Sequence, residues 1–234
     1  MPRRIALPVR FAARAVTAKS VDASALTGKL LGTTLEANLA TLTSGAGADN
    51  ITLNGAIKHT IATGAGVDTI TVTSTAAATS IDAGSGDDII SVQDADAIVI
   101  VAGDGDDKIT IGAAALTVDS DAIIVGGDGS DTLVIDTNSE AVDLSNNVNF
   151  AISGIEKIDL TDLTSTVTIS AAQLAGNKTL TLIGNGADDI FAVGKGTATG
   201  AVVIDLSGVT IASGSTVTIS ATGGDKADTI TGSG

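Results

Sequence analysis

Seven nine-residue segments combine glycines and one aspartate at a constant spacing, and their residue types suit cation binding. Each has Gly at its second position, Asp at its sixth, and Ile or Leu at its eighth. Gly adopts φ > 0 readily and can turn carbonyl oxygens toward the inside of a loop, where a carboxylate adds charged oxygens. Calcium prefers about six to eight such hard ligands. The segments are "SGAGADNIT" from Ser44, "TGAGVDTIT" from Thr63, "AGSGDDIIS" from Ala83, "AGDGDDKIT" from Ala102, "GGDGSDTLV" from Gly126, "IGNGADDIF" from Ile183 and "GGDKADTIT" from Gly223.

One such loop has too few oxygens for a calcium ion, so we expect each ion to lie between two stacked loops. The strongest candidate ligands are the sixth-position aspartates Asp49, Asp68, Asp88, Asp107 and Asp131. The same loops add the carbonyl groups of Gly45, Gly64, Gly84, Gly103 and Gly127, and the third-position residues Asp104, Asp128 and Asp225 are further candidates. Asp188 and Asp228 are weaker candidates, because no motif adjoins theirs and Lys226 replaces a glycine. Five consecutive motifs therefore predict about four calcium sites between loops. A Gly–Asp cluster can also be only a tight turn, but seven copies favour calcium.

The spacing of the motifs predicts the architecture. Their second-position glycines are Gly45, Gly64, Gly84, Gly103, Gly127, Gly184 and Gly224. The first four follow one another at a nearly constant interval, and the two longest gaps are near three and two times that interval. Segments such as "ITVTST" and "AIVIVA" between the motifs alternate as strands do. We therefore expect an all-β, right-handed parallel β-solenoid with about 19–20 residues per coil throughout. Its motifs stack on one edge, and the eighth-position residues point inward as a ladder. Short helices are plausible at "GTTLEANLATL" and "AAQLAG".

Composition agrees with a strand repeat and excludes some partners. The 234 residues include 28 Gly, three Phe, no Trp, no Tyr and no Cys, so the core must be aliphatic and disulfides are excluded. A net charge of −15 argues against nucleic acid and favours cations. No apolar run is long enough for a membrane span.

We divide the chain into a basic N-terminal arm at 1–20 and a solenoid at 21–234, motif-dense at 44–134 and motif-sparse at 135–234. The arm is a flexible tail, a basic segment that docks on an acidic neighbouring subunit, or a poor export signal.

The nonapeptides resemble the hemolysin-type calcium-binding repeat of RTX proteins. One motif per coil differs from the standard β-roll and is similar to the sparser arrangement in bacterial surface-layer proteins. "VDASALTGKL", "ISGIEKIDL" and "VVIDLSGVTI" also resemble segments of surface-layer and surface-adhesion proteins built of β-strand repeats. The resemblance extends from about residue 20 onward. It implies several Ca²⁺ ions, type I secretion, folding triggered by calcium outside the cell, and a bacterial cell-surface location.

The sequence predicts a structural, calcium-dependent module of a surface layer or extracellular fibre that assembles with itself and is not an enzyme. Cell-surface polysaccharide or lipopolysaccharide are further possible partners. The single histidine, His59, is expected at the surface, and no HExxH motif is present. One alternative is an adhesion or ice-binding surface made of outward threonines, although unequal coil lengths would disturb their registration. Another is a non-catalytic RTX module of a secreted polysaccharide-acting enzyme.

Overall fold

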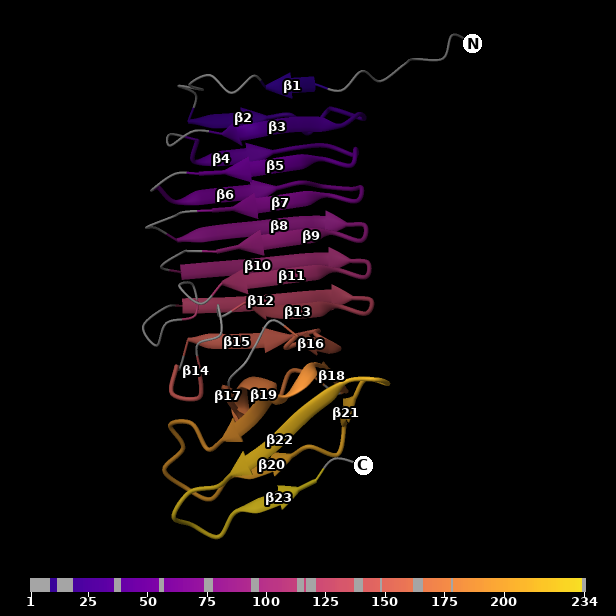
Figure 1. Ribbon diagram of the computed structural model, residues 1–234. Helices are drawn as coiled ribbons and strands as arrows, with labels where there is room; N and C mark the ends of the chain where they lie inside the picture. The colour runs from indigo at the N-terminus through magenta and orange to yellow at the C-terminus, as the bar shows by residue number, and fades with distance from the viewer. Residues whose placement is uncertain are drawn as a thin grey trace.

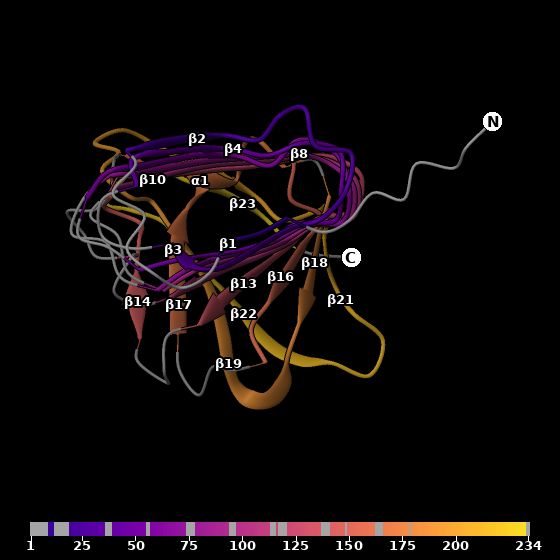
Figure 2. The ribbon, with the colours of Figure 1, turned by 90° about the horizontal axis from the view of Figure 1, so that it is seen from above.

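The chain forms a right-handed parallel β-solenoid, as the motif spacing predicts. The computed structural model describes residues 9–11, 19–35, 39–54, 57–73, 78–93, 97–112, 116, 121–136, 141–147, 149–161, 166–177 and 179–232. Strands stack one above another from the N-terminal to the C-terminal end (Figure 1). Viewed from the N-terminal end, the chain turns clockwise as it recedes, and the first coils form a flattened ring (Figure 2).

The front of the solenoid in Figure 1 is a ten-stranded parallel sheet, which we call sheet A. Its pairing advances by one coil at each step, for example from Thr69 to Ile89 and from Ile89 to Lys108. In order, its strands are β1 (Val9–Phe11), β3 (Leu30–Leu35), β5 (Asn50–Leu53), β7 (Thr69–Val72), β9 (Ile89–Val92), β11 (Lys108–Gly112), β13 (Thr132–Asp136), β16 (Lys157–Asp159), β18 (Leu180–Ile183) and β21 (Val209–Ile211).

The opposite wall of the flattened ring is a seven-stranded parallel sheet, which we call sheet B. Each of its strands up to β12 leads through a short turn into the next strand of sheet A. Its strands are β2 (Ser20–Asp22), β4 (Thr41–Thr43), β6 (His59–Ala62), β8 (Thr79–Ser85), β10 (Ala97–Asp104), β12 (Asp121–Asp128) and β15 (Phe150–Ser153).

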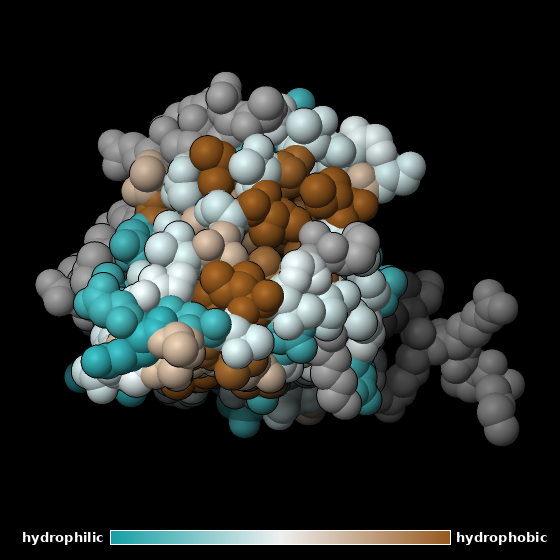
Figure 3. All heavy atoms as spheres, turned by 90° about the horizontal axis from the view of Figure 1, so that it is seen from below, coloured by the Kyte–Doolittle hydropathy of each residue, from teal (hydrophilic) through white to brown (hydrophobic). Residues whose placement is uncertain are grey.

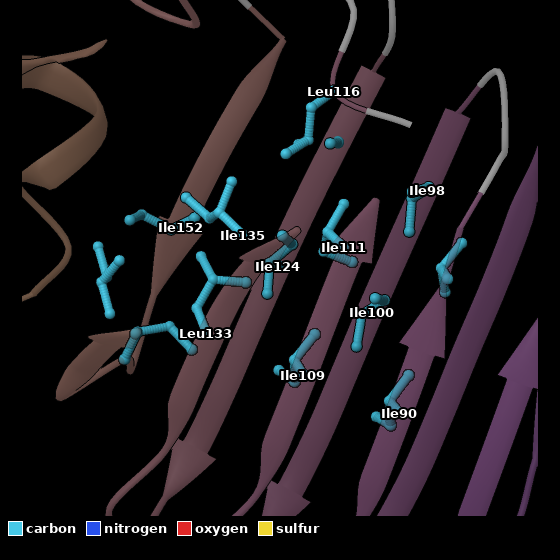
Figure 4. Close-up of a cluster of buried hydrophobic side chains, with 14 of the residues drawn as sticks. Ile90, Ile98, Ile100, Ile109, Ile111, Leu116, Ile124, Leu133, Ile135 and Ile152 are labelled. Atoms are coloured by element: carbon cyan, nitrogen blue, oxygen red, sulfur yellow. The ribbon is translucent and has the colours of Figure 1, made fainter. Parts of the chain in front are cut away.

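Aliphatic ladders fill the space between the two sheets, because alternate residues of each strand point inward. Ile90, Ile109 and Leu133 are paired from coil to coil in sheet A and are at most 1% exposed. Ile100 and Ile124 are paired opposite them in sheet B and are equally buried. Figure 4 shows these side chains meeting in the interior. The eighth-position residues of the first five motifs therefore form the predicted inward ladder.

The prediction of one coil length for the whole chain is wrong from β13 onward. Between each of the last four pairs of neighbouring strands in sheet A, the paired residues are further apart in the sequence than Thr69 and Ile89. These four steps are marked by the register pairs Lys108–Thr132, Thr132–Lys157, Lys157–Thr181 and Thr181–Thr210.

A third wall, which begins after β13, explains the longer coils that follow. Figure 2 shows its strands outside the outline of the earlier coils. It consists of β14 (Val142–Asp143), β17 (Thr166–Ser170), β19 (Asn185–Gly194) and β22 (Thr216–Thr222). On the side of sheet B, β20 (Val203–Asp205) pairs with β23 (Thr229–Thr231).

One of the two expected helices is present. The segment "AAQLAG" contains α1 (Ala171–Leu174), which packs against β15 and β20, and Ser170 and Gln173 cap its N-terminus reciprocally. The segment "GTTLEANLATL" instead contributes to β3 and β4, and its residues 36–38 lie outside the described part. Within the expected basic arm, Val9–Phe11 form β1 against β3, whereas residues 1–8 and 12–18 lie outside the described part. No helix in the described ranges has the length and apolar character of a membrane span.

Candidate metal-binding edge

Five of the Gly–Asp motifs form stacked turns on one edge, where the chain passes from sheet B to sheet A. Gly84, Gly103 and Gly127 occupy paired register positions in successive coils. Gly84 has φ of +102°, and a Cβ there would collide with the carbonyl oxygen of Gly64 in the preceding coil. Only glycine meets both conditions, so its repetition follows from the close stacking of the turns.

The sixth-position aspartates of these turns form a ladder inside the edge. The backbone N–H of each of the first four donates to Oδ1 of the aspartate in the next coil, over 2.7 Å from Asp68 to Asp88 and 2.9 Å from Asp107 to Asp131. All five members are at most 2% exposed: Asp49, Asp68, Asp88, Asp107 and Asp131. The strongest candidates from the sequence are thus brought together in one buried row.

The second oxygen of every aspartate in this row has no hydrogen-bond partner. Oδ2 of Asp49, Asp68, Asp88, Asp107 and Asp131 is buried and unsatisfied in each case. A buried carboxylate oxygen without a partner is costly, because water has been removed and nothing replaces it. The row therefore needs protons or a cation along its Oδ2 side. A hard divalent cation suits these donors, since calcium prefers oxygen.

Burial shifts the acidity of this row. Removal from water is the main cause that raises the pKa of Asp88 to about 7. The negative charges of Asp68 and Asp107 raise this pKa further, whereas the hydrogen bond from the Asp68 N–H lowers it. Burial also raises the pKa of Asp131 to about 6 and the pKa of Asp68 and Asp107 above the usual value. Stacked carboxylates thus resist ionisation together unless positive charge is supplied.

A second acidic row runs along the outside of the same turns. Asp106 N–H donates to Oδ1 of Asp87, and Ser130 N–H donates to Oδ1 of Asp106, both over 2.9 Å. These fifth-position residues were not among the sequence candidates, although the repeated "DD" pairs mark them. Asp104 and Asp128, which were candidates, are exposed beside them. The outer row therefore adds negative charge to the edge.

The second-position glycines contribute to these turns mainly through the stacking of their backbones. The carbonyl oxygens of Gly45 and Gly64 accept N–H bonds from the next coil, over 3.2 Å and 2.9 Å. Those of Gly64, Gly84 and Gly103 face the glycine Cα one coil further on. They thus point along the solenoid axis, beside the row of carboxylates rather than across the loop.

The ladder has different neighbours at its two ends. At the start, Leu30 stands where later coils have aspartate, and its N–H donates to Asp49 Oδ1 over 2.6 Å. At the far end, Glu156 Oε2 accepts the N–H of Asp131 over 2.9 Å. The sequence motif did not identify Glu156, because its turn has Gly154 at the fourth position but Ile152 in place of the second-position glycine. Glu156 lies two residues before the inward Ile158, as each ladder aspartate lies two residues before an inward residue, and Ile158 pairs with Leu133. This spacing could have identified Glu156.

The sixth and seventh motifs do not join this edge. The side chain of Asp188 lies outside the described part, and the buried aspartate of its motif is Asp189, 1% exposed, followed two residues later by the inward Phe191. Oδ2 of Asp189 accepts the N–H groups of Asn185 and Gly186 in its own turn. This turn lies at the start of β19, where its pairing with β22 shifts register between Asn185 and Ile190, away from the passage between sheets B and A.

Asp228 behaves similarly in the turn between β22 and β23. Its Oδ2 accepts the N–H of Gly224 in the same turn, and its Oδ1 accepts the N–H of Val202. The third-position Asp225 of this motif is exposed. Ile230, at the eighth position, is 48% exposed and so does not extend the inward ladder. In these two motifs the carboxylate is satisfied by backbone donors, as in a turn that needs no metal.

His59 is buried, contrary to the expected surface position. It is 1% exposed in β6, and its Nδ1 donates to the carbonyl oxygen of Leu39 over 2.7 Å. Nε2 has no partner among the described residues. The side chain faces inward in register with Thr79, since both occupy an inward position of sheet B. Here His59 acts as a core residue.

The buried edge offers one carboxylate per coil. Among the described residues, no group of three or more His, Cys, Asp or Glu side chains gathers as a metal cluster. An ion at this edge would therefore combine two successive aspartates with carbonyl oxygens and water. Such a mixed set is normal for calcium, which accepts flexible geometry and backbone ligands.

Comparison with known proteins adds no relative to this description. The chain matches no protein-family model, no curated protein and no solved structure.

Proposed function

We propose that the chain is a structural calcium-binding module, in which Ca²⁺ ions bridge adjacent coils and drive folding and self-assembly. The supporting observation is the row of five unsatisfied, buried Oδ2 atoms along one edge. Calcium between successive coils neutralises the row and replaces its lost hydration. A secreted surface layer or extracellular fibre of a bacterium suits such a module, because free calcium is plentiful outside the cell. No catalytic role is proposed for any residue.

The test is a calcium titration of the purified chain in parallel with an Asp88→Asn variant. Asn retains an oxygen that can accept the Asp68 N–H, but removes the charge. We expect isothermal titration calorimetry to detect several ions in the parent chain and fewer or weaker ones in the variant. Asp82→Asn, on the exposed outer face of β8, is the matched control. Equal binding by the parent and Asp88→Asn chains would contradict the proposal.

Self-assembly is proposed to use the C-terminal end of the solenoid, with a coil of a second copy as the partner. The last strands β21, β22 and β23 each present an edge without a partner strand among the described residues. Val203, Ile211 and Ile230 are 67%, 43% and 48% exposed there. Figure 3 views this end and shows apolar surface bordered by polar residues. Free sheet edges together with exposed apolar area favour strand-on-strand stacking.

Assembly is tested by electron microscopy and light scattering with and without calcium. We expect filaments or sheets in calcium, and their loss in excess EGTA. Ile230→Lys is expected to prevent stacking while leaving calcium binding intact, because Ile230 is far from the ladder in the sequence and exposed. Polymers that survive both EGTA and the lysine variant would exclude this mode of assembly.

A second candidate function is supported by the outer face of sheet A. Thr52, Thr71, Ser91 and Thr110 are paired across four successive coils. Coils of slightly different length therefore keep these positions in register, because the loops absorb the difference; the expected disturbance does not occur there. Such a hydroxyl-bearing row could bind an ordered surface such as ice. Thermal hysteresis in a solution of the monomer would support this function, and its absence would exclude ice binding.

A further inference from the structure

The last turn of the carboxylate ladder has a set of oxygen ligands unlike that of the five turns before it. Its sequence, Ser153 to Glu156, lacks the nonapeptide and joins β15 to β16. Glu156 nevertheless occupies the ladder position, since its Oε2 accepts the N–H of Asp131 over 2.9 Å. Asp131 itself is 0% exposed, and its Oδ2 is unsatisfied.

Two oxygens converge beside Gly126 in this part of the edge. A Cβ at Gly126 would collide with the carbonyl oxygen of Gly154 and would lie 2.5 Å from Oδ2 of Asp131. The equivalent first position of the earlier motifs has a side chain, namely Ser44, Thr63, Ala83 or Ala102. The absence of a side chain at Gly126 therefore allows oxygen atoms from two coils to approach the same point.

The row of carboxylates stops immediately after Glu156. In the next coil the side chain that contacts this turn is Asn177. Its Oδ1 accepts the N–H of Ile155 over 2.9 Å, and its Nδ2 donates to the carbonyl oxygen of Ile152 over 3.3 Å. This amide is neutral and engaged on both sides. Glu156 is thus the last charged member of the row, next to the unsatisfied Oδ2 of Asp131.

We propose that Glu156, the carbonyl oxygen of Gly154 and Oδ2 of Asp131 form one more divalent-cation site, at the C-terminal end of the ladder. The inference depends on the proposed function and adds a site to the four expected between the nonapeptides. The three ligands are hard oxygens from successive coils, as calcium prefers, and water completes the coordination. The site joins the regular coils to the three-walled part of the solenoid.

The test counts ions bound to the full chain by equilibrium dialysis against calcium, with Tb³⁺ luminescence as a second probe. Glu156→Gln keeps an oxygen for the Asp131 N–H and removes the charge. We expect this variant to bind one ion fewer per chain than the parent, with Asp82→Asn unchanged as the control. Circular dichroism in saturating calcium verifies that each variant is folded.

Gly126→Ala provides an independent variant because its added Cβ would displace the carbonyl oxygen of Gly154 and Oδ2 of Asp131 without altering a carboxylate. Ala occurs naturally at the equivalent positions 83 and 102. We expect the loss of the same single ion. A parent that binds no calcium would overturn both this site and the proposed function. A parent that binds calcium, with the same number of ions in Glu156→Gln and Gly126→Ala, would overturn this site alone.

Discussion

The same Gly–Asp motif occurs in two environments in this molecule. In the first five copies, Oδ1 of the carboxylate accepts an N–H group of the preceding coil, and Oδ2 is buried without a partner. In the copies near Asp189 and Asp228, Oδ2 accepts N–H groups of its own turn. In the first arrangement a buried oxygen needs a proton or a cation, whereas in the second a backbone N–H group already satisfies that oxygen. Stacking on an equivalent turn therefore distinguishes the motifs proposed to bind metal from those that form only a tight turn.

The largest expected effect is that of calcium on the five stacked turns. Each saturated site contributes about 2.7 kcal/mol when free calcium exceeds its dissociation constant 100-fold. Hydrogen exchange should show that calcium increases the protection of amides in 44–134, and much less in the turns at 184–189 and 223–228. Equal gains in protection in all seven turns would remove the distinction between the two classes.

The pH dependence of the calcium-free protein is the next largest effect. The pKa of Asp88, about 7, and that of Asp131, about 6, exceed the value of 3.8 that applies to an unfolded chain. The folded state thus binds protons more tightly, so its stability is greatest below about pH 4 and decreases as pH rises through 7. Thermal unfolding in EGTA at pH 4 to 8 measures this. Saturating calcium should remove the decrease, because the ions replace the protons. A melting temperature in EGTA that rises over this range would contradict the prediction.

Gly84→Ala is expected to destabilise the protein by about 2–5 kcal/mol, since it combines an unfavourable φ with overpacking. Gly214→Ala is the matched control, because Gly214 has φ of +82° but an added Cβ would touch nothing. It should cost only about 1–2 kcal/mol. Denaturant unfolding in calcium compares the two. Equal losses would show that the stacked turns are not tightly packed.

The smallest expected effects are those of single Asp→Asn substitutions on stability in the absence of calcium. The change in stability should have opposite signs in the stacked turns and in the two later turns. Asp189→Asn should destabilise by about 1 kcal/mol, because one charged oxygen, Oδ2, accepts both the Asn185 and Gly186 N–H groups, and a neutral amide oxygen is a weaker acceptor. Asp88→Asn should be neutral or stabilising in EGTA, since it removes a buried charge. Chemical denaturation at pH 8 measures both. The same sign for both variants would be inconsistent with the comparison.

Much of the regular half could be predicted from residue spacing. Ile90 and Ile109 are the eighth residues of consecutive motifs, and their inward pairing follows from the period of one coil. The buried row of Asp68, Asp88 and Asp107 follows from the same period. Glu156 was missed, since its turn keeps a glycine at the fourth position, Gly154, but has Ile152 at the second. Asp189 was missed because a two-residue "DD" leaves the register open by one position.

Residue spacing is enough to specify the strand type, the coil length of the first half and the edge on which the acidic turns stack, because a strict repeat places equivalent residues above one another. Which carboxylate oxygens are satisfied, and where the third wall begins, is visible only in the folded chain. Those outcomes depend on which turn lies next to which in space. Beyond β13, where the third wall lengthens the coil, a motif no longer specifies its neighbour.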